Sequence, residues 1–119
     1  MNSPAYVSII IPTYNRKETL LKCLKSFESQ SYPLDEFEVI VVDDGSGDGT
    51  FQLVEEYSKK SKIKIIIIAQ KNSGPGLARN LGVQNSAGEI LGFTEDDITI
   101  DAKWIANAVR YISSNDVDG

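Results

Sequence analysis

The sequence predicts one α/β domain of 119 residues in which helices cover a mostly parallel sheet. Three observations support this fold class. Short apolar runs rich in β-branched residues alternate with segments whose apolar residues recur at helical spacing. The run from Val39 to Val42 lacks polar alternation, which is typical of a strand covered on both faces. The runs are followed by polar or glycine-containing loops, as expected at the binding edge of such a sheet.

The chain alternates between expected strands and expected helices. The strands are expected at Val7–Pro12, Val39–Val42, Ile63–Ala69 and Glu89–Thr94. The helices are expected from about Arg16 to Gln30, from Asp48 or Thr50 to the polar run Ser58–Lys62, from Ser73 and Pro75 to a break at Gly88, and from Asp101 onward. Asn15, with Glu18 three residues later, resembles the start signal of the first helix.

This alternation implies parallel strands joined by right-handed crossovers, so all four strands end at the same edge of the sheet. If the strand order is 3-2-1-4, the first and fourth strands flank the topological switch point, where the strand order reverses. Ligands bind at such a point in open α/β sheets. We therefore expect Thr13 and Tyr14 to face Glu95 and Asp97 across a crevice.

Two acidic clusters follow expected strands. Continued strand alternation would make Glu95 and Asp97 converge while Asp96 points away. Converging carboxylates suit Mg²⁺ or Mn²⁺ together with phosphate oxygens, and the alternative is an acidic turn that caps the next helix. Of Asp43 and Asp44, one should point into the sheet and the other into the crevice, where it can accept hydrogen bonds from a ribose or base; the alternative is that both only hold loop amides.

Other candidate ligand residues lie at the same edge. Tyr14 can stack on a base or be an ordinary half-buried tyrosine. Arg79 and Asn80 lie in the first turns of the third helix, where an arginine can pair with a diphosphate or simply form a surface salt bridge. The glycines do not form the dinucleotide-binding pattern, and the P-loop pattern is absent from the sequence.

Composition limits the chemistry. The net charge of −5 argues against nonspecific binding of nucleic acid, and the absence of histidine leaves carboxylates as metal ligands and proton carriers. The single Cys23 is consistent with a reducing compartment. The sequence also lacks an apolar run long enough to cross a bilayer. We expect a cytoplasmic location or a peripheral one at the cytoplasmic face of the membrane.

Five segments together resemble a known family. They read VSIIIPTYNR, EVIVVDDGSGDGT, NSGPGLARNLGV, GEILGFTEDD and DAKW, and they stand in the order and approximate spacing seen in family 2 glycosyltransferases of GT-A fold. The resemblance extends from Val7 to about Ile112. It implies a Rossmann-like three-layer sandwich, here incomplete, with residues 1–119 forming the part of a GT-A domain that binds a nucleoside-diphosphate sugar.

The resemblance also implies roles for individual residues. The base of a UDP- or GDP-sugar would lie near Pro12, Thr13, Tyr14 and Asp44. Glu95 and Asp97 would occupy the D-x-D positions and hold Mg²⁺ or Mn²⁺, with Asp97 as the main ligand and Glu95 where aspartate is commoner. The full set assigned to substrate binding is Pro12, Thr13, Tyr14, Asn15, Asp43, Asp44, Gly74, Arg79, Asn80, Glu95 and Asp96.

The expected activity is metal-dependent, inverting transfer of the sugar to an acceptor hydroxyl in polysaccharide, glycolipid or glycoprotein synthesis. The partners would be the donor and a saccharide or lipid-linked acceptor, with no nucleic acid, and exposed apolar surface would permit self-association. The family's acceptor-binding half and catalytic base are expected beyond Gly119. The alternatives are a nucleotide-binding module without catalysis and a phospho-acceptor receiver-like domain, whose acidic pair should follow the first strand, where this chain has PTYN.

Overall fold

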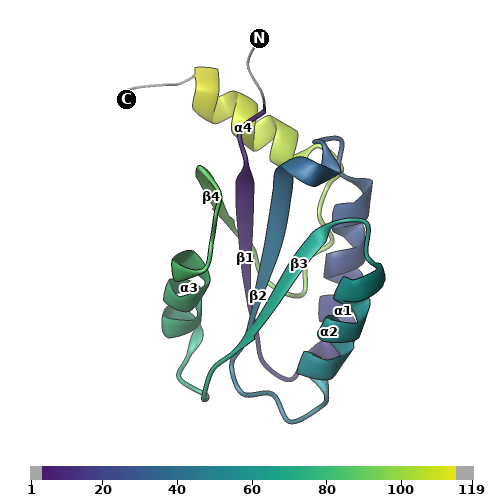
Figure 1. Cartoon of the computed structure of the whole chain (residues 1–119), viewed down its shortest axis with the longest axis vertical. Coiled ribbons are helices and arrows are strands. Elements are labelled where there is room, and N and C mark those ends of the chain that lie inside the picture. The colour runs from purple at the N-terminus through teal and green to yellow at the C-terminus, as the bar shows by residue number, and fades with distance from the viewer. Residues whose placement is uncertain (1–3, 115–119) are drawn as a thin grey trace.

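The computed structural model describes residues 4–114, which form four strands and four α-helices in alternation (Figure 1). The strands are β1 (Val7–Thr13), β2 (Phe37–Asp43), β3 (Lys64–Ala69) and β4 (Ile90–Phe93). The helices are α1 (Lys17–Ser26), α2 (Thr50–Lys60), α3 (Pro75–Gln84) and α4 (Trp104–Ser114), and short 3₁₀ turns lie at Phe27–Ser29 and Leu34–Glu36. The predicted alternation is confirmed.

The strands form one parallel sheet in the order β3-β2-β1-β4, as predicted. The register pairs Thr13 at the end of β1 with Asp43 at the end of β2, and Asp43 in turn with Ala69 at the end of β3. β4 is shorter and pairs with the first four residues of β1, from Val7 to Ile10. The ends of all four strands therefore lie toward one edge of the sheet, as the crossovers require.

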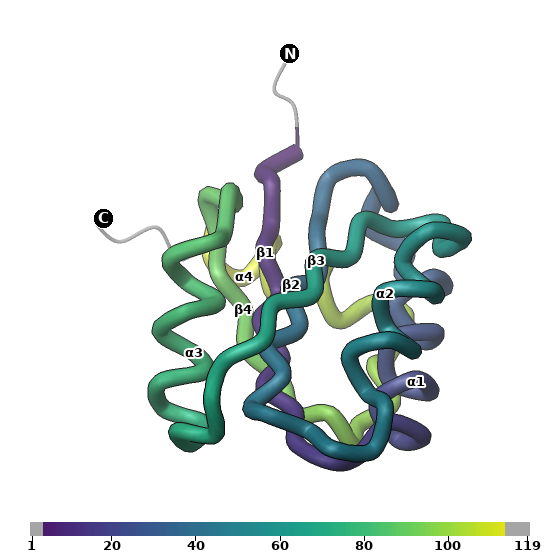
Figure 2. Tube along the Cα trace, turned by 60° about the horizontal axis from the view of Figure 1, so that its bottom comes forward, coloured from purple at the N-terminus to yellow at the C-terminus, as the bar shows by residue number. Residues whose placement is uncertain are grey.

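The sheet lies between two helical layers (Figure 2). Val39 and Val41 belong to the larger core cluster, together with buried side chains of α1, α2 and α4. Ile40 and Val42 belong to a smaller cluster with Ala78 of α3 on the opposite face. This division explains why the apolar run of β2 lacks alternation, since both of its faces are buried. The three-layer α/β sandwich predicted from the sequence is confirmed.

Helix α3 lies unusually close to the sheet. A Cβ atom placed on Gly82 would come within 2.6 Å of Cγ2 of Ile10 on β1, so a larger residue would force the helix and strand apart. At the other end of α3, Gly74 is the N-cap with φ 98° and ψ 161°, a backbone conformation that is essentially restricted to glycine. The sequence favours Ser73 as the N-cap ahead of Pro75, and this prediction is wrong by one residue, because the hydroxyl of Ser73 donates to the carbonyl of Lys71 instead.

The predicted start of the first helix is also wrong in detail. The helix begins at Lys17 with Arg16 as its N-cap, and the Arg16 side chain makes no capping hydrogen bond. N of Lys17 donates instead to Oδ2 of Asp48 at 3.3 Å. Asn15 has a positive φ of 52° and its Oδ1 accepts a hydrogen bond from N of Gly47 at 2.8 Å, so its side chain joins the loops after β1 and β2. Asparagine tolerates this left-handed conformation better than most residues do.

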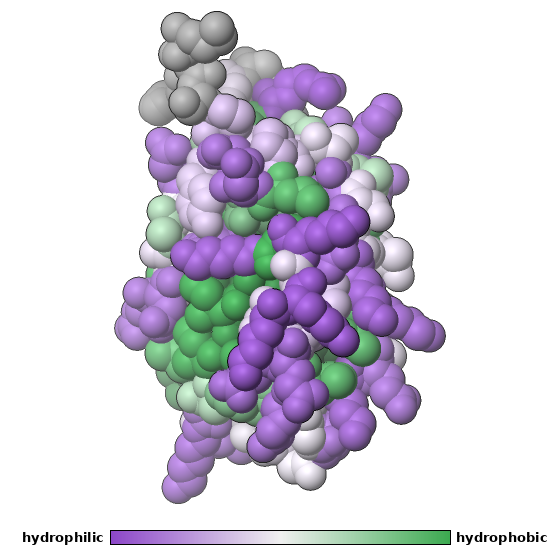
Figure 3. Space-filling view, turned by 45° about the vertical axis from the view of Figure 1, so that its right-hand side comes forward, coloured by the Kyte–Doolittle hydropathy of each residue, from purple (hydrophilic) through white to green (hydrophobic). Residues whose placement is uncertain are grey.

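Apolar residues remain at the surface of both sheet edges. Phe93 and Leu91 of the edge strand β4 are exposed, and the isoleucines of β3 are half-buried. Figure 3 shows one face of the molecule, on which apolar side chains gather beside a band of hydrophilic ones. The expected self-association through such surface stays a prediction. Within residues 4–114, no helix has the length and apolar character needed to cross a membrane.

Candidate functional site

The loops after β1, β2 and β4 and the start of α3 surround a divided crevice at the carboxyl edge of the sheet. One hollow has a volume of about 200 Å³ and is lined by Pro12, Thr13, Tyr14, Arg16, Asp44, Pro75 and Asp96. A second hollow of about 280 Å³ is lined by Pro12, Arg16, Pro75, Arg79, Thr94, Glu95 and Asp96. The two share four residues, so they adjoin. They lie between the ends of β1 and β4, where the strand order predicts a ligand site.

Asp96 connects the two strand ends that form the crevice. Its side chain is buried, and Oδ2 accepts a hydrogen bond from Oγ1 of Thr13 at 2.8 Å. Its other oxygen, Oδ1, lies 3.3 Å from Nη1 of Arg16. Both oxygens of Asp96 are thus engaged by side chains from the end of β1 and the loop that follows it. This carboxylate holds the loop after β4 against the loop after β1.

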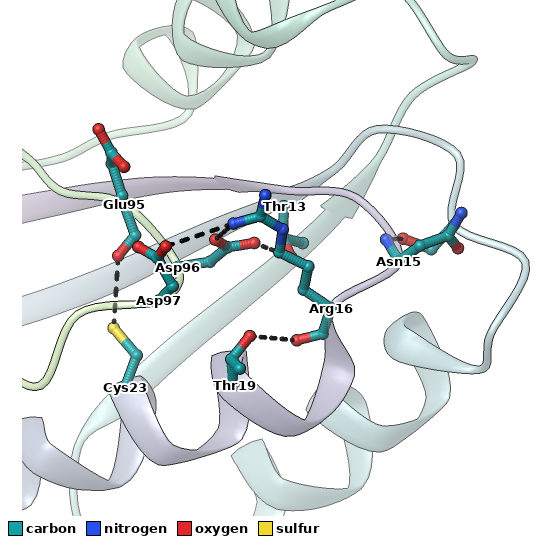
Figure 4. Close-up of polar contacts among 9 residues, drawn as sticks. Thr13, Asn15, Arg16, Thr19, Cys23, Glu95, Asp96 and Asp97 are labelled. Carbon is teal, nitrogen blue, oxygen red and sulfur yellow. Dashed lines mark hydrogen bonds and ion pairs between the residues drawn. The ribbon is translucent and has the colours of Figure 1, made fainter.

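The prediction that Glu95 and Asp97 converge while Asp96 points away is wrong. Asp96 and Asp97 converge on Arg16, whereas the side chain of Glu95 points in another direction (Figure 4). The physical reason is that β4 ends at Phe93 and residues 96 and 97 form a turn, so the alternation of a strand no longer applies there. Consequently Thr13 pairs with Asp96 rather than facing Glu95 and Asp97.

Of the two carboxylates that contact Arg16, Asp97 is the accessible one. Its side chain is 47% exposed and contacts Nη1 of Arg16 at 3.5 Å through Oδ2. The backbone beside it is supported from below by α1, because the thiol of Cys23 donates to the carbonyl of Glu95 at 3.7 Å (Figure 4). Burial, and then the nearby charge of Asp96, raise the pKa of Cys23 to about 11, so the thiol stays protonated and able to donate.

Asp43 and Asp44 both accept hydrogen bonds from the protein. Oδ1 of Asp43 accepts from N of Ser46 at 2.9 Å and shapes its own loop. Asp44 lines the 200 Å³ hollow, as predicted, but its carboxylate is also the centre of the loop after β3. It accepts from N of Ser73 at 2.7 Å and from N of Gly74 at 3.1 Å. The loop-holding alternative thus describes the contacts of both aspartates, and a contact of Asp44 with a base stays a prediction.

Further contacts keep Asp44 ionised. Nε2 of Gln70 donates to its Oδ1 at 2.8 Å, and Asn72 contributes a longer bond. Burial on its own raises the pKa of the Asp44 carboxyl. The hydrogen bonds from Gln70, Ser73 and Gly74 outweigh burial and bring that pKa below its ordinary value. Asp44 is therefore a charged anchor for the loop that leads into Pro75 and α3.

The remaining assigned residues differ in position. Tyr14 is 48% exposed and lines the 200 Å³ hollow, which leaves part of its ring accessible for stacking. Arg79 is exposed on α3 and lines the 280 Å³ hollow, whereas Asn80 lines neither hollow. Asn15 lies in a third hollow of about 530 Å³ with Arg16, Lys17, Glu18, Thr19, Asp48 and Asp97. Gly74 shapes the loop through its backbone.

Arg16 is the main site residue that sequence reasoning missed. It lines all three hollows and is the cation that contacts Asp96 and Asp97 within the described part of the chain. The only sequence signal was its place directly after the PTYN loop, at the expected start of a helix. Gln70 was missed as well, because its contact with Asp44 depends on how the loop after β3 folds.

The donor chemistry of this cluster fits a divalent cation bound together with phosphate. Mg²⁺ and Mn²⁺ prefer oxygen ligands and commonly use one or two carboxylates plus substrate phosphates. Asp97 offers an exposed carboxylate of this kind beside the crevice. No group of three or more acidic or cysteine side chains within residues 4–114 could form a metal site without further ligands. The metal ligand role of Glu95 stays a prediction.

Comparison with known proteins agrees with this geometry. The family model for glycosyl transferase family 2 matches residues 8–119, which is nearly the whole chain. The chain belongs to glycosyl transferase family 2. Family membership agrees with the resemblance that the five sequence segments carry, and the α/β fold is that of GT-A glycosyltransferases.

Curated relatives are glycosyltransferases much longer than this chain. The glycosyltransferase AglE of Haloferax volcanii is 40% identical over 113 residues, which are 95% of this chain and 37% of AglE. The poly(ribitol-phosphate) β-N-acetylglucosaminyltransferase TarS of Staphylococcus aureus is 36% identical over 111 residues, 93% of this chain and 19% of TarS. The chain thus spans well under half the length of these relatives.

Two similar solved structures contain a nucleotide sugar. S. aureus TarS in complex with UDP-GlcNAc aligns with a TM-score of 0.83 and 36% identity over 92% of this chain and 31% of that one. The mannosyltransferase PcManGT of Pyrobaculum calidifontis, in complex with GDP-Man and Mn²⁺, aligns with a TM-score of 0.87 and 29% identity over 93% of this chain and 33% of that one.

Proposed function

We propose that this chain forms the donor site of a glycosyltransferase and binds a UDP- or GDP-linked sugar at the carboxyl edge of its sheet. The observation that carries the proposal is the pair of adjoining hollows between β1 and β4, next to the exposed carboxylate of Asp97. The donors seen in TarS and PcManGT support the ligand class.

The two hollows suit the two ends of a nucleotide. The base and ribose would occupy the 200 Å³ hollow, where the Tyr14 ring can stack and polar atoms of Thr13 and Asp44 lie close by. The diphosphate would extend toward the 280 Å³ hollow, where the exposed Arg79 guanidinium can pair with phosphate oxygens. Asp43 and Gly74 would act indirectly, by holding the loops that line these hollows.

A divalent cation, Mg²⁺ or Mn²⁺, would neutralise the charge that grows on the leaving diphosphate. Asp97 is the residue whose carboxylate is placed to hold it, since both oxygens of Asp96 already have protein partners. The chain's own residues would bind and orient the donor so that its anomeric carbon faces an acceptor hydroxyl. Attack from the side opposite the leaving group would invert the configuration.

We place the acceptor-binding half and the base that deprotonates the acceptor outside residues 1–119. The support is that TarS and PcManGT are about three times as long as the aligned part. The acceptor would be a saccharide or a lipid-linked saccharide, and the protein would work in the cytoplasm or at the cytoplasmic face of the membrane. Alone, residues 1–119 would behave as a nucleotide-binding module, because they correspond to about a third of the TarS and PcManGT chains.

Calorimetric titration tests the donor site. UDP and GDP are each titrated into the chain with and without Mn²⁺, and the titrations are repeated on Asp97→Asn. We expect one nucleotide to bind more tightly with Mn²⁺, and this gain to be lost in the variant because its side chain no longer carries the negative charge that holds the cation.

Asp35→Asn is the matched control, because it removes the same charge from an exposed residue in the turn that leads into β2, at the opposite edge of the sheet. It should bind nucleotide like the unmodified chain. If the folded chain binds neither nucleotide in the presence of Mn²⁺, or if both variants lose binding equally, the donor site is not where we propose it.

A further inference from the structure

Arg16 occupies a central position in the crevice. Its side chain is 56% exposed, yet Nη1 lies 3.3 Å from Oδ1 of Asp96 and 3.5 Å from Oδ2 of Asp97. It lines the hollows of about 200, 280 and 530 Å³, so this residue stands where they meet. A single cation thus bridges the two adjacent carboxylates, as Figure 4 shows.

The backbone and the side chain of Arg16 are held differently. Its carbonyl accepts hydrogen bonds from N of Leu20 at 2.9 Å and from Oγ1 of Thr19 at 3.2 Å, so the backbone is fixed as the N-cap of α1. Within residues 4–114, the exposed side chain forms its ion pairs with these two carboxylates. Ion pairs of such exposure are weak and exchange readily.

We propose that Arg16 is an exchangeable counter-ion of Asp96 and Asp97, and that it makes metal binding depend on the diphosphate. This inference rests on the proposed donor site. A divalent cation that binds Asp97 must displace the guanidinium or bind beside a positive charge, and either is unfavourable for the cation alone. A diphosphate removes this obstacle, because its oxygens both complete the cation's ligand shell and offer the displaced guanidinium a new anionic partner.

The exchange would also change the shape of the crevice. Asp96 keeps its hydrogen bond from Thr13 when Arg16 leaves, so the loops after β1 and β4 stay joined. Movement of the guanidinium alone would open the boundary between the three hollows that it lines. Arg16 is therefore a positioning residue, whose effect should appear in the coupling between metal and nucleotide rather than in folding.

The first measurement is the affinity for Mn²⁺ alone, followed by the loss of the free-ion electron paramagnetic resonance signal. Arg16→Gln should bind Mn²⁺ three- to tenfold more tightly than the unmodified chain, or about 0.7 to 1.4 kcal/mol. Arg16→Lys, which keeps the charge, should stay within about twofold. Lys17→Gln is the matched control, because it removes the same charge from a residue that lines the same hollow as Asp97. Within residues 4–114, the ion pairs with Asp96 and Asp97 are formed by Arg16 and not by Lys17.

The second measurement is the coupling between Mn²⁺ and nucleotide. UDP or GDP, whichever the unmodified chain binds, is titrated with and without Mn²⁺, after correction for the metal complex that the nucleotide forms in solution. The factor by which Mn²⁺ strengthens nucleotide binding equals the factor by which nucleotide strengthens Mn²⁺ binding. In Arg16→Gln this factor should fall at least threefold, because the metal no longer has a competitor to displace.

A general charge effect predicts something different. It would tighten Mn²⁺ binding equally with and without nucleotide, or equally in Arg16→Gln and Lys17→Gln, and either result would overturn the exchange. Arg16→Gln, Asp97→Asn should lose the gained Mn²⁺ affinity, and its retention would equally count against the proposal. If no variant binds Mn²⁺ alone at millimolar concentration, the exchange is also rejected. The nucleotide titrations test the donor site separately.

Discussion

Two aspartate pairs look alike in the sequence and differ in what surrounds them. Asp43 and Asp44 follow the central strand β2, and Asp96 and Asp97 follow the edge strand β4. Asp44 is buried and receives two backbone N–H groups and a glutamine amide. Asp97 is half exposed and contacts one movable guanidinium. A carboxylate whose oxygens already accept hydrogen bonds from the protein stabilises the loops of the site. A carboxylate whose oxygens remain accessible can bind a ligand.

The difference follows from the position of each strand. β2 is flanked on both sides by other strands, so the loop after it is enclosed by the loops after β1 and β3. Backbone N–H groups in these loops need hydrogen-bond acceptors, and the carboxylate of Asp44 accepts from two of them, in Ser73 and Gly74. The loop after β4 has a neighbouring strand on one side within the described sheet. Asp96 turns toward that neighbour, and Asp97 remains accessible.

The largest effect is expected from replacing the enclosed carboxylate of Asp44 and the accessible one of Asp97. Asp44→Ala should lower the free energy of unfolding by about 2 to 4 kcal/mol, because several donors of the loop after β3 lose their buried charged acceptor. Asp97→Ala should change it by no more than about 0.5 kcal/mol, since only an exposed ion pair is lost. Urea unfolding measures both. Comparable losses in the two variants would mean that the pairs do not differ in the way described.

Gly74 tests whether the Asp44 loop depends on its backbone shape. Gly74→Ala should cost about 1 to 3 kcal/mol, because its φ of 98° with ψ of 161° lies in a region that L residues avoid. Gly76→Ala is the matched control, two residues away inside α3, where an added Cβ has no atom within 4 Å. It should be neutral or stabilise by up to about 1 kcal/mol. Equal destabilisation by both substitutions would show that helix propensity, and not loop geometry, decides the outcome.

A double-mutant cycle tests how Asp96 joins the two strand ends. Thr13→Val and Asp96→Ala each remove one side of the 2.8 Å hydrogen bond. Their coupling energy should be about 1 to 2 kcal/mol, because the bond is buried and its acceptor is charged. The pair Thr19→Val and Asp96→Ala is the control, since Thr19 donates to the carbonyl of Arg16 and not to Asp96. Additive effects of Thr13→Val and Asp96→Ala would show that this hydrogen bond does not join the ends of β1 and β4.

Sequence reasoning predicted the strand order, the layers and the edge that holds the crevice. The layers and the binding edge depend on apolar periodicity and on the handedness of crossovers, which act locally or apply to all such sheets. The strand order was an assumption that agrees with the resemblance to GT-A glycosyltransferases. It also brought Thr13, Tyr14 and Asp44 to one hollow, because the strand ends must meet at one edge. Their contacts with a donor remain to be measured.

The errors arose where side chains from distant loops choose partners. The alternation of β4 was extended to Asp97, although the strand ends at Phe93 and the turn that follows exchanges the directions of the three acidic side chains. The contact of Arg16 with Asp96 spans 80 positions in the sequence, and that of Gln70 with Asp44 spans 26. Neither is encoded in a local pattern, since each depends on how two loops are placed by the sheet.

The smallest effect expected from the contrast is a dependence on pH. Hydrogen bonds from Gln70, Ser73 and Gly74 outweigh burial and hold the pKa of Asp44 below its ordinary value of 3.8. A lowered folded-state pKa means that the ionised carboxylate stabilises the fold above pH 3.8 and that this contribution is lost as the pH falls through the folded-state pKa. The difference in unfolding free energy between the unmodified chain and Asp44→Asn should thus be constant near neutral pH and shrink below 3.8.

Urea unfolding at a series of pH values measures this difference. Asp48, whose pKa is also lowered, chiefly by the hydrogen bond from the Thr50 side chain, contributes in the same sense. Asp44→Asn should therefore remove part of the acid sensitivity of the chain and leave the part that Asp48 carries. Asp48 lies just before α2, where its Oδ1 accepts from N of Thr50, and it is outside the loop after β3, so the two contributions should add. Parallel curves for the unmodified chain and Asp44→Asn down to acid pH would show that the loop does not depend on the charge of Asp44.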